Sequence, residues 1–148
     1  PLAPNIVYLE DSGTTICSMK VWGSPWSKLY GTWPFMLPEH ELDAKWNLIP
    51  NDTDILMTHG PPYGIGDRVW DGRMEGSITL YERIKQIRPM LHVFGHIHEG
   101  RGQYTYGGFF GSKITHLVNA SCVKFEAGIK LIPITDYMEI EINNGNIL

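Results

Sequence analysis

The feature that most constrains the fold is a strand-helix-strand pattern in the middle of the chain. Residues 54–58 (DILMT) form a short apolar run ended by Gly60 and two prolines, and residues 90–94 (MLHVF) form another. Between them, residues 77–87 (SITLYERIKQI) carry apolar side chains at helical spacing behind a serine suited to cap the helix. Such a unit crosses over right-handed and leaves its strands parallel. The pattern therefore predicts an α/β fold with both strands ending at one sheet edge.

The flanking segments predict further strands and one more helix. The predicted strands are residues 5–10 (NIVYLE), 14–22 (TTICSMKVW), 114–121 (ITHLVNAS) and 137–142 (YMEIEI), and the predicted helix is residues 38–46 (PEHELDAKW), with a proline start and an acidic first turn. We expect the first two strands to form a hairpin that turns at Ser12 and Gly13. An Asn144-Gly145 turn should follow the last strand. All of this is expected to form one domain over residues 1–148.

Three histidines follow the two central strands. His59 comes directly after the first strand, and His96 and His98 follow the second. Neighbouring strands lie about 4.8 Å apart and a metal-imidazole bond is about 2.0 to 2.1 Å long, so His59 and one of the later pair can share a divalent ion. An extended backbone would point His96 and His98 to the same side, whereas a tighter turn would direct them to two ions. We expect the glycines beside them, Gly60 and Gly95, to bend the chain.

The other histidines fit structural positions better. His40 lies at a predicted helix start among charged residues and should be exposed, whereas His92 lies in mid-strand and should be a hydrogen-bonded interior residue. His116 should also be interior. The two cysteines, Cys17 and Cys122, form no metal-binding pair and are expected to be small buried side chains in a reducing compartment.

Composition excludes several classes of function. The net charge of −4, without a stripe of Lys and Arg, argues against a nucleic-acid partner, and no apolar run approaches the ~20 residues that a membrane span needs. The first residues lack the features of a secretory signal, which leads us to expect a cytoplasmic protein without a membrane partner.

A His-x-His motif also occurs in cupins, but those expect a Glu about four residues further on, whereas Glu99 is adjacent to His98.

Several stretches together resemble the calcineurin-like metallophosphoesterases. They are THGPP and GHIHEG and, more specifically for the metallophosphoesterase-domain-containing subgroup known from animal brain, VWGSPW, KWNLIPNDTDILMTHGPP, LHVFGHIHEG and VNASC. The likeness runs from about residue 8 to about residue 123. It implies a four-layer α/β/β/α sandwich, of which this chain resembles the C-terminal part. It also implies a hydrolase that cleaves phosphodiesters, including cyclic nucleotides, with a hydroxide bridging two metal ions.

By motif position, the resemblance implies that His59 and His96 bind one ion and His98 the other. The ions would be Mn, Fe, Zn or Mg, with Mn favoured. The family's other ligands and its catalytic histidine come from Asp-x-His, Gly-Asp and Gly-Asn-His motifs that should precede Thr58. This sequence has no Asp followed two positions later by His and no Asn directly before a His. Gly66-Asp67 comes too late in the chain and reads as part of a polar loop.

Two interpretations of function follow, and the sequence leaves both open. In the first, this chain is part of an active phosphoesterase whose N-terminal half is absent here, so that the chain alone is inactive or weak and is expected to self-associate or to pair with that half. In the second, it is a degenerate member that binds a ligand or partner without turnover. Neither interpretation assigns a catalytic residue within these 148 residues.

Other side chains near the predicted site are expected to support it. Asn119 and Ser121 should form hydrogen bonds near the histidines, and Glu99 could orient an imidazole. An aromatic loop either walls a substrate pocket or, as we prefer, packs on the sheet, and its members are Trp22, Trp26, Tyr30, Trp33 and Phe35.

Overall fold

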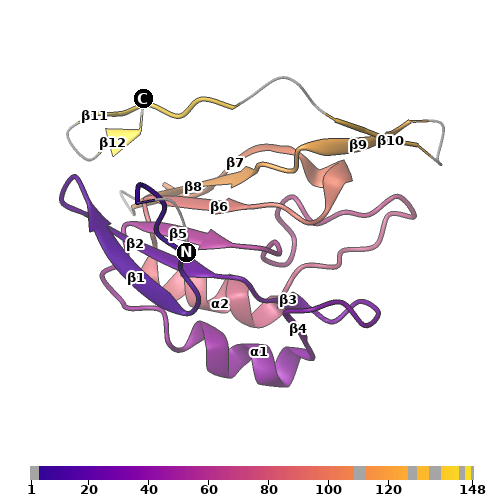
Figure 1. The fold of residues 1–148 in the computed structure, drawn as a ribbon, viewed down its shortest axis with the longest axis horizontal. Coiled ribbons are helices and arrows are strands. Elements are labelled where there is room, and N and C mark those ends of the chain that lie inside the picture. The colour runs from indigo at the N-terminus through magenta and orange to yellow at the C-terminus, as the bar shows by residue number, and fades with distance from the viewer. Residues whose placement is uncertain (1–3, 109–112, 127–129, 134–137, 144–145, 148) are drawn as a thin grey trace.

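A mixed sheet with two helices on one face forms the body of the protein (Figure 1). The computed structural model describes residues 4–108, 113–126, 130–133, 138–143 and 146–147. The sheet has the order β1-β2-β5-β6-β8-β7, and its strands are Ser12–Ile16, Met19–Ser24, Ile55–Thr58, Leu91–Phe94, Ile114–Asn119 and Gly102–Gly107 in that order. The remaining elements are β3 (Ser27–Lys28), β4 (Met36–Leu37), α1 (Glu39–Trp46), α2 (Ile78–Ile87), the 3₁₀ helix η1 (His98–Gly100), β9 (Val123–Glu126), β10 (Lys130–Pro133), β11 (Ile142–Asn143) and β12 (Asn146–Ile147).

The predicted strand-helix-strand unit is confirmed. β5 pairs in parallel with β6, with Met57 opposite Val93, and α2 connects them. Ser77 caps α2 by accepting a hydrogen bond from the Leu80 amide at 3.1 Å, and Arg88 ends the helix in the left-handed conformation. This unit fixes the strand ends that carry the histidines.

The hydrophobic core lies between the helices and the sheet. Its buried members are Leu42, Trp46, Ile49, Leu56, Leu80, Ile84 and Ile87. The indole of Trp46 also donates to the Ser77 hydroxyl at 3.1 Å, so the end of α1 is tied to the start of α2. The core is thus built by α1 and the turn after it, by β5 and by α2, and it lies directly beside the strand that leads to His59. None of the helices among the described residues has the length and apolar character of a membrane span.

The predicted hairpin forms, but its position in the sequence was wrong. The turn between β1 and β2 is formed by Cys17 and Ser18, both with positive φ. Ser12 and Gly13 lie in β1 and pair with residues of β2. Residues 5–10 form no strand. Two residues with positive φ match the twist of a two-residue hairpin, which explains why the turn lies there. The cysteine prediction was also wrong, because Cys17 and Cys122 are both exposed.

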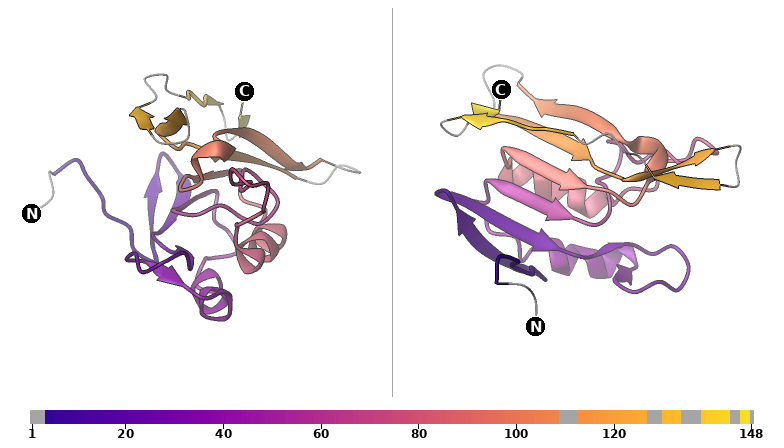
Figure 2. Two further views of the ribbon diagram at one scale, coloured as in Figure 1. Left: turned by 90° about the vertical axis from the view of Figure 1, so that its right-hand side faces the viewer. Right: turned by 45° about the horizontal axis from the view of Figure 1, so that its top comes forward.

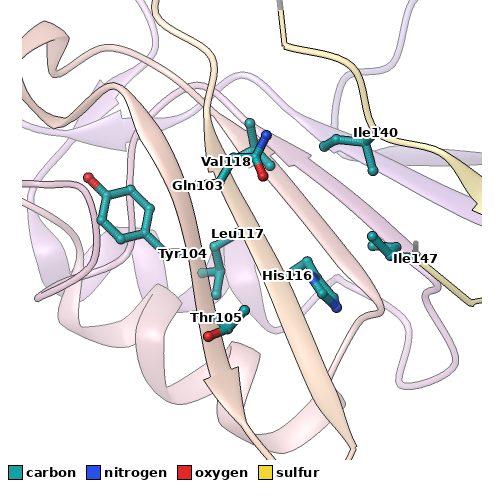
Figure 3. A pocket seen from close by; sticks show the side chains of 8 residues that line it. All are labelled: Gln103, Tyr104, Thr105, His116, Leu117, Val118, Ile140 and Ile147. Atoms are coloured by element: carbon teal, nitrogen blue, oxygen red, sulfur yellow. The ribbon is translucent and has the colours of Figure 1, made fainter.

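The C-terminal strands lie on the side of the sheet away from the helices (Figures 1 and 2). β9 pairs with β10 and β11 pairs with β12, both antiparallel. Within the described part of the predicted strand, residues 138–142, only Ile142 lies in a strand, and residue 137 and the predicted turn at 144–145 fall outside the described residues. A cavity of about 170 Å³ separates β7 and β8 from Ile140 and Ile147, and half-buried His116 contributes to its lining (Figure 3).

Candidate metal centre

The two central strands bring His59 and His96 together at the carboxyl edge of the sheet. β5 ends at Thr58 and β6 ends at Phe94, and beyond the paired register the Gly95 amide donates to the His59 carbonyl at 3.0 Å. The imidazole centres of His59 and His96 are 4.8 Å apart, with the rings inclined at 57°. Two imidazoles that share one tetrahedral ion through bonds of about 2.0 to 2.1 Å have ring centres roughly 5 Å apart. The observed spacing matches that arrangement.

Partial burial keeps this pair of imidazoles uncharged near neutral pH. Desolvation lowers the pKa of His59, and it also lowers the pKa of His96, with the nearby imidazoles of His59 and His98 adding to the effect. A neutral imidazole has a free lone pair on one ring nitrogen, which a divalent metal ion requires. The electrostatics of the pair therefore favour binding a cation over carrying a charge.

The backbone between His96 and His98 forms a tight turn and is not extended. His96 has φ +70°, the Ile97 amide donates to the Gly95 carbonyl at 2.8 Å, and η1 begins at His98. The expectation that Gly95 supplies the bend was wrong, because the left-handed residue is His96 itself. A left-handed conformation costs a non-glycine residue about 1 to 2 kcal/mol. The chain does bend at Gly60, as expected, and this glycine also allows close packing, since a Cβ there would lie 2.8 Å from the Ser27 Cβ.

His92 supports the His59 turn from inside the sheet, as the sequence predicted for an interior histidine. Its side chain is fully buried, with Nε2 at 2.8 Å from the Thr58 hydroxyl, which itself lies 2.7 Å from the Gly60 carbonyl. Because the hydroxyl has one hydrogen and donates it to that carbonyl, it accepts from Nε2, which fixes the His92 tautomer. Burial lowers the pKa of His92 to about 3.

All three predicted histidines line one cavity of about 610 Å³. One side comes from the β3–β4 connection, which contributes Tyr30 and Trp33, and another comes from the loop between β5 and α2, which contributes Trp70. These three rings are 70%, 69% and 84% exposed, whereas Trp26 packs edge-on against Phe35 at 5.4 Å and Trp22 lies against the core. Some aromatic side chains of the loop therefore line the cavity, and the others pack against the body of the protein. Sequence reasoning missed Trp70, although a tryptophan in a Gly-rich loop was a signal.

Charged side chains at the cavity balance one another. Lys28 and Arg73 both pair with Glu75, at 3.1 Å and 3.0 Å, and so connect the β3–β4 ribbon to the loop after β5. Glu99 is the fourth charged lining residue, so two positive and two negative groups sum to zero. The cavity has no net charge of its own to attract an anion.

Gly66-Asp67, which resembled a metal motif only superficially, organises the loop beside the cavity. Asp67 is 1% exposed, and its Oδ2 accepts hydrogen bonds from the Gly64 amide at 2.9 Å and the Gly76 amide at 3.0 Å. This carboxylate brings the two ends of the loop together. The loop carries Trp70 and Arg73 to the cavity as a result.

The donor set suits a metal ion only in part. Neutral His59 and His96 at the observed spacing fit two ligand positions of one divalent ion, and His98 lines the same cavity. Across the described ranges, however, no group of three or more His, Cys, Asp or Glu side chains lies close enough to hold an ion. Because a divalent ion takes four or more ligands, these residues can form part of a metal site and no more.

Comparisons with known proteins agree with the predicted resemblance. No family model matches the chain. It is 44% identical over 124 residues to metallophosphoesterase domain-containing protein 1 of Homo sapiens, a match covering 81% of this chain and 36% of the relative. A UPF0046 protein of Caenorhabditis elegans is 36% identical over 135 residues, covering 90% of this chain and 44% of that protein. The chain thus spans less than half the length of these relatives.

The fold has a counterpart among solved structures. One crystal structure superposes with a TM-score of 0.56 and 22% identity, covering 80% of this chain and 47% of the other. At that identity the likeness shows the fold alone, and it agrees with the predicted partial α/β architecture. The similarity in sequence carries the assignment: this chain is a homologue of the metallophosphoesterase domain-containing and UPF0046 proteins and resembles a C-terminal part of them.

Proposed function

We propose that this chain supplies the histidine side of a two-metal phosphoesterase site that hydrolyses a small phosphodiester, such as a cyclic nucleotide. The supporting observation is the pair of neutral imidazoles, 4.8 Å apart, lining a cavity of about 610 Å³. His98 would serve the second ion, and Mn²⁺ is the favoured metal. Bound ions would supply a nucleophilic hydroxide and polarise the phosphoryl oxygens. The remaining ligands would come from motifs that precede Thr58 in the family.

The cavity's own residues suit such a substrate once metal is present. Exposed Trp33 and Trp70 offer planar surfaces on which a base can stack. The balanced charges of the lining mean that attraction of the phosphate depends on bound ions. We therefore expect phosphodiester binding to require Mn²⁺ and to be lost with EDTA.

A chimera provides the test. This chain would replace the matching part of the human relative, with which it shares 44% identity, and hydrolysis of bis-para-nitrophenyl phosphate would be measured with Mn²⁺ and with EDTA. We expect Mn²⁺-dependent turnover that His59→Ala and His96→Ala abolish. His40→Ala, at a side chain that is 80% exposed, is the matched control and should have no effect.

The chain alone should hydrolyse the same ester no faster than its His96→Ala/His98→Ala double variant. Clear, mutation-sensitive turnover by the chain alone would refute the view that further ligands are needed. Turnover of the chimera that survives loss of both His59 and His96 would refute the proposed site itself.

A binding role without turnover is the second candidate. It is favoured by the absence of a three-ligand group in the part of the chain that the structure describes. In that case the chimera would bind Mn²⁺ in calorimetry through His59 and His96 and would show no hydrolysis above the EDTA background.

A further inference from the structure

A buried amide lies directly behind the turn that carries His96 and His98. Asn119 ends β8, pairs in register with Phe94 at the end of β6, and is 0% exposed. Its Nδ2 donates to the Ile97 carbonyl at 2.8 Å and to the Gly66 carbonyl at 3.0 Å. One side chain therefore holds both the residue between the two histidines and the loop that forms a cavity wall.

The other end of the amide is equally occupied. Its Oδ1 accepts from the Ser121 amide at 3.1 Å and from the Ser121 hydroxyl at 2.7 Å. Two donors and two acceptors use the whole hydrogen-bonding capacity of an asparagine side chain. The orientation is also fixed, because the reverse one would place Oδ1 against two carbonyls and Nδ2 against an N–H. An aspartate has the same shape, but it has no N–H to offer the two carbonyls.

Close packing around the amide leaves the turn little freedom. A Cβ on Gly100, at the end of η1, would lie 1.9 Å from the Gly66 carbonyl oxygen and 3.1 Å from Nδ2 of Asn119. Tyr104 lies in the next strand, β7, and its hydroxyl donates a hydrogen bond to the Gly100 carbonyl at 2.8 Å. The ends of η1, β8 and the loop after β5 thus converge on Asn119.

From these contacts we infer that Asn119 is the positioning residue of the histidine site. By fixing the Ile97 carbonyl, it sets where the imidazoles of His96 and His98 stand relative to His59. By holding Gly66, it also keeps the wall that carries Trp70 in register with them. This inference deepens the proposed function and rests on it for the identity of the ligand. Residues that orient metal-binding histidines typically change metal affinity about 10- to 100-fold when replaced.

The test uses Asn119→Asp in the chimera, together with Leu42→Ala as a control. Leu42 is fully buried in the core at α1, so its truncation lowers stability without touching the amide network. We expect Asn119→Asp to move the ring ¹⁵N signals of His96 and His98 in NMR spectra while leaving the signals of exposed His40 in place. Zn²⁺ affinity, measured by calorimetry, should fall at least tenfold. Leu42→Ala should change neither property.

Ser121→Ala keeps the inference testable if the aspartate variant does not fold. It removes one of the two donors to Oδ1 and should move the same His96 and His98 signals by a smaller amount. Unmoved ring signals in either folded variant, or equal losses of Zn²⁺ affinity in Asn119→Asp and Leu42→Ala, would overturn the positioning role. The NMR measurement needs no metal. If the unsubstituted protein bound no Zn²⁺, the proposed function would fail while the role of Asn119 was still decided.

Discussion

Acidification should destabilise the protein through His92. The side chain is fully buried, and burial lowers its pKa from an ordinary 6.5 to about 3. The unfolded chain therefore binds a proton at this residue between those two values, and the folded chain does not. Because the folded pKa is the lower one, the contribution to stability is present above pH 6.5 and is lost as the pH falls below it.

The magnitude follows from the difference in bound protons. Between pH 7.5 and pH 5.5, an unfolded-state pKa of 6.5 gives a loss of about 1.4 kcal/mol, which is the cost of one decade in proton affinity. The result hardly depends on the folded pKa, provided that it lies well below 5.5. For a domain of this size, a loss of that order is a substantial fraction of the ~5 to 15 kcal/mol of total stability.

Urea unfolding followed by tryptophan fluorescence at each pH provides the assay. His59 and His96 also have lowered pKa values, so the quantity of interest is the difference between the unsubstituted chain and His92→Gln. Glutamine can donate to the Thr58 hydroxyl but does not titrate. We expect the pH-dependent loss to shrink by about 1.4 kcal/mol in His92→Gln and to be unchanged in His40→Gln, on the surface. Equal pH dependence in His92→Gln and the unsubstituted chain would refute the reasoning.

Four further predictions concern stability and association. His96→Gly should keep or raise the unfolding free energy, by up to about 1 kcal/mol, because it relieves a left-handed residue; a clear loss in urea unfolding would contradict this. Gly100→Ala should lower the unfolding free energy by about 1 to 3 kcal/mol, because the added methyl group overpacks its surroundings. Gly95→Ala should lower it little in the same assay, because the nearest atom to the added Cβ would lie 3.5 Å away. Ser77→Ala should lower the unfolding free energy by about 1 to 3 kcal/mol, because it removes the cap of α2 and the acceptor of the buried Trp46 indole, and an unchanged thermal midpoint would argue against both roles. The chain alone should self-associate in size-exclusion chromatography, less so with Met57→Lys at an apolar side chain that is 47% exposed, and a compact monomer would contradict the expected self-association.

Local signals made the central unit predictable. The cap at Ser77, the helical spacing of Ile78, Tyr81, Ile84 and Ile87, and the apolar strands on either side all point to the same structure, and parallel pairing follows from the connection. The buried face of the helix is nevertheless Leu80, Ile84 and Ile87, and Ile78 is 53% exposed. The meeting of His59 and His96 follows in turn, because each comes directly after a strand of that unit. This part of the site needed only the rule that parallel strands end at the same edge.

Features set by distant contacts were not predictable in the same way. The cavity wall at Trp70 depends on Asp67, whose bonds to Gly64 and Gly76 close a loop that has no regular periodicity. The hairpin was misplaced because Ser12-Gly13 is a stronger local turn signal than Cys17-Ser18, and the pairing of β1 with β2 overrides that preference.

The hydrogen bond from the Gly95 amide to the His59 carbonyl continues the ladder one step past the paired residues of β5 and β6. The separation of the backbone segments that carry the two imidazoles is therefore set by the spacing of neighbouring strands, which every parallel sheet maintains, whereas Asn119 holds the turn that orients the His96 ring. Loops around the cavity can change length and composition over evolution without altering that separation. Relatives with very different pockets could thus keep the same pair of rings, and selection on ligand choice could act on the walls alone.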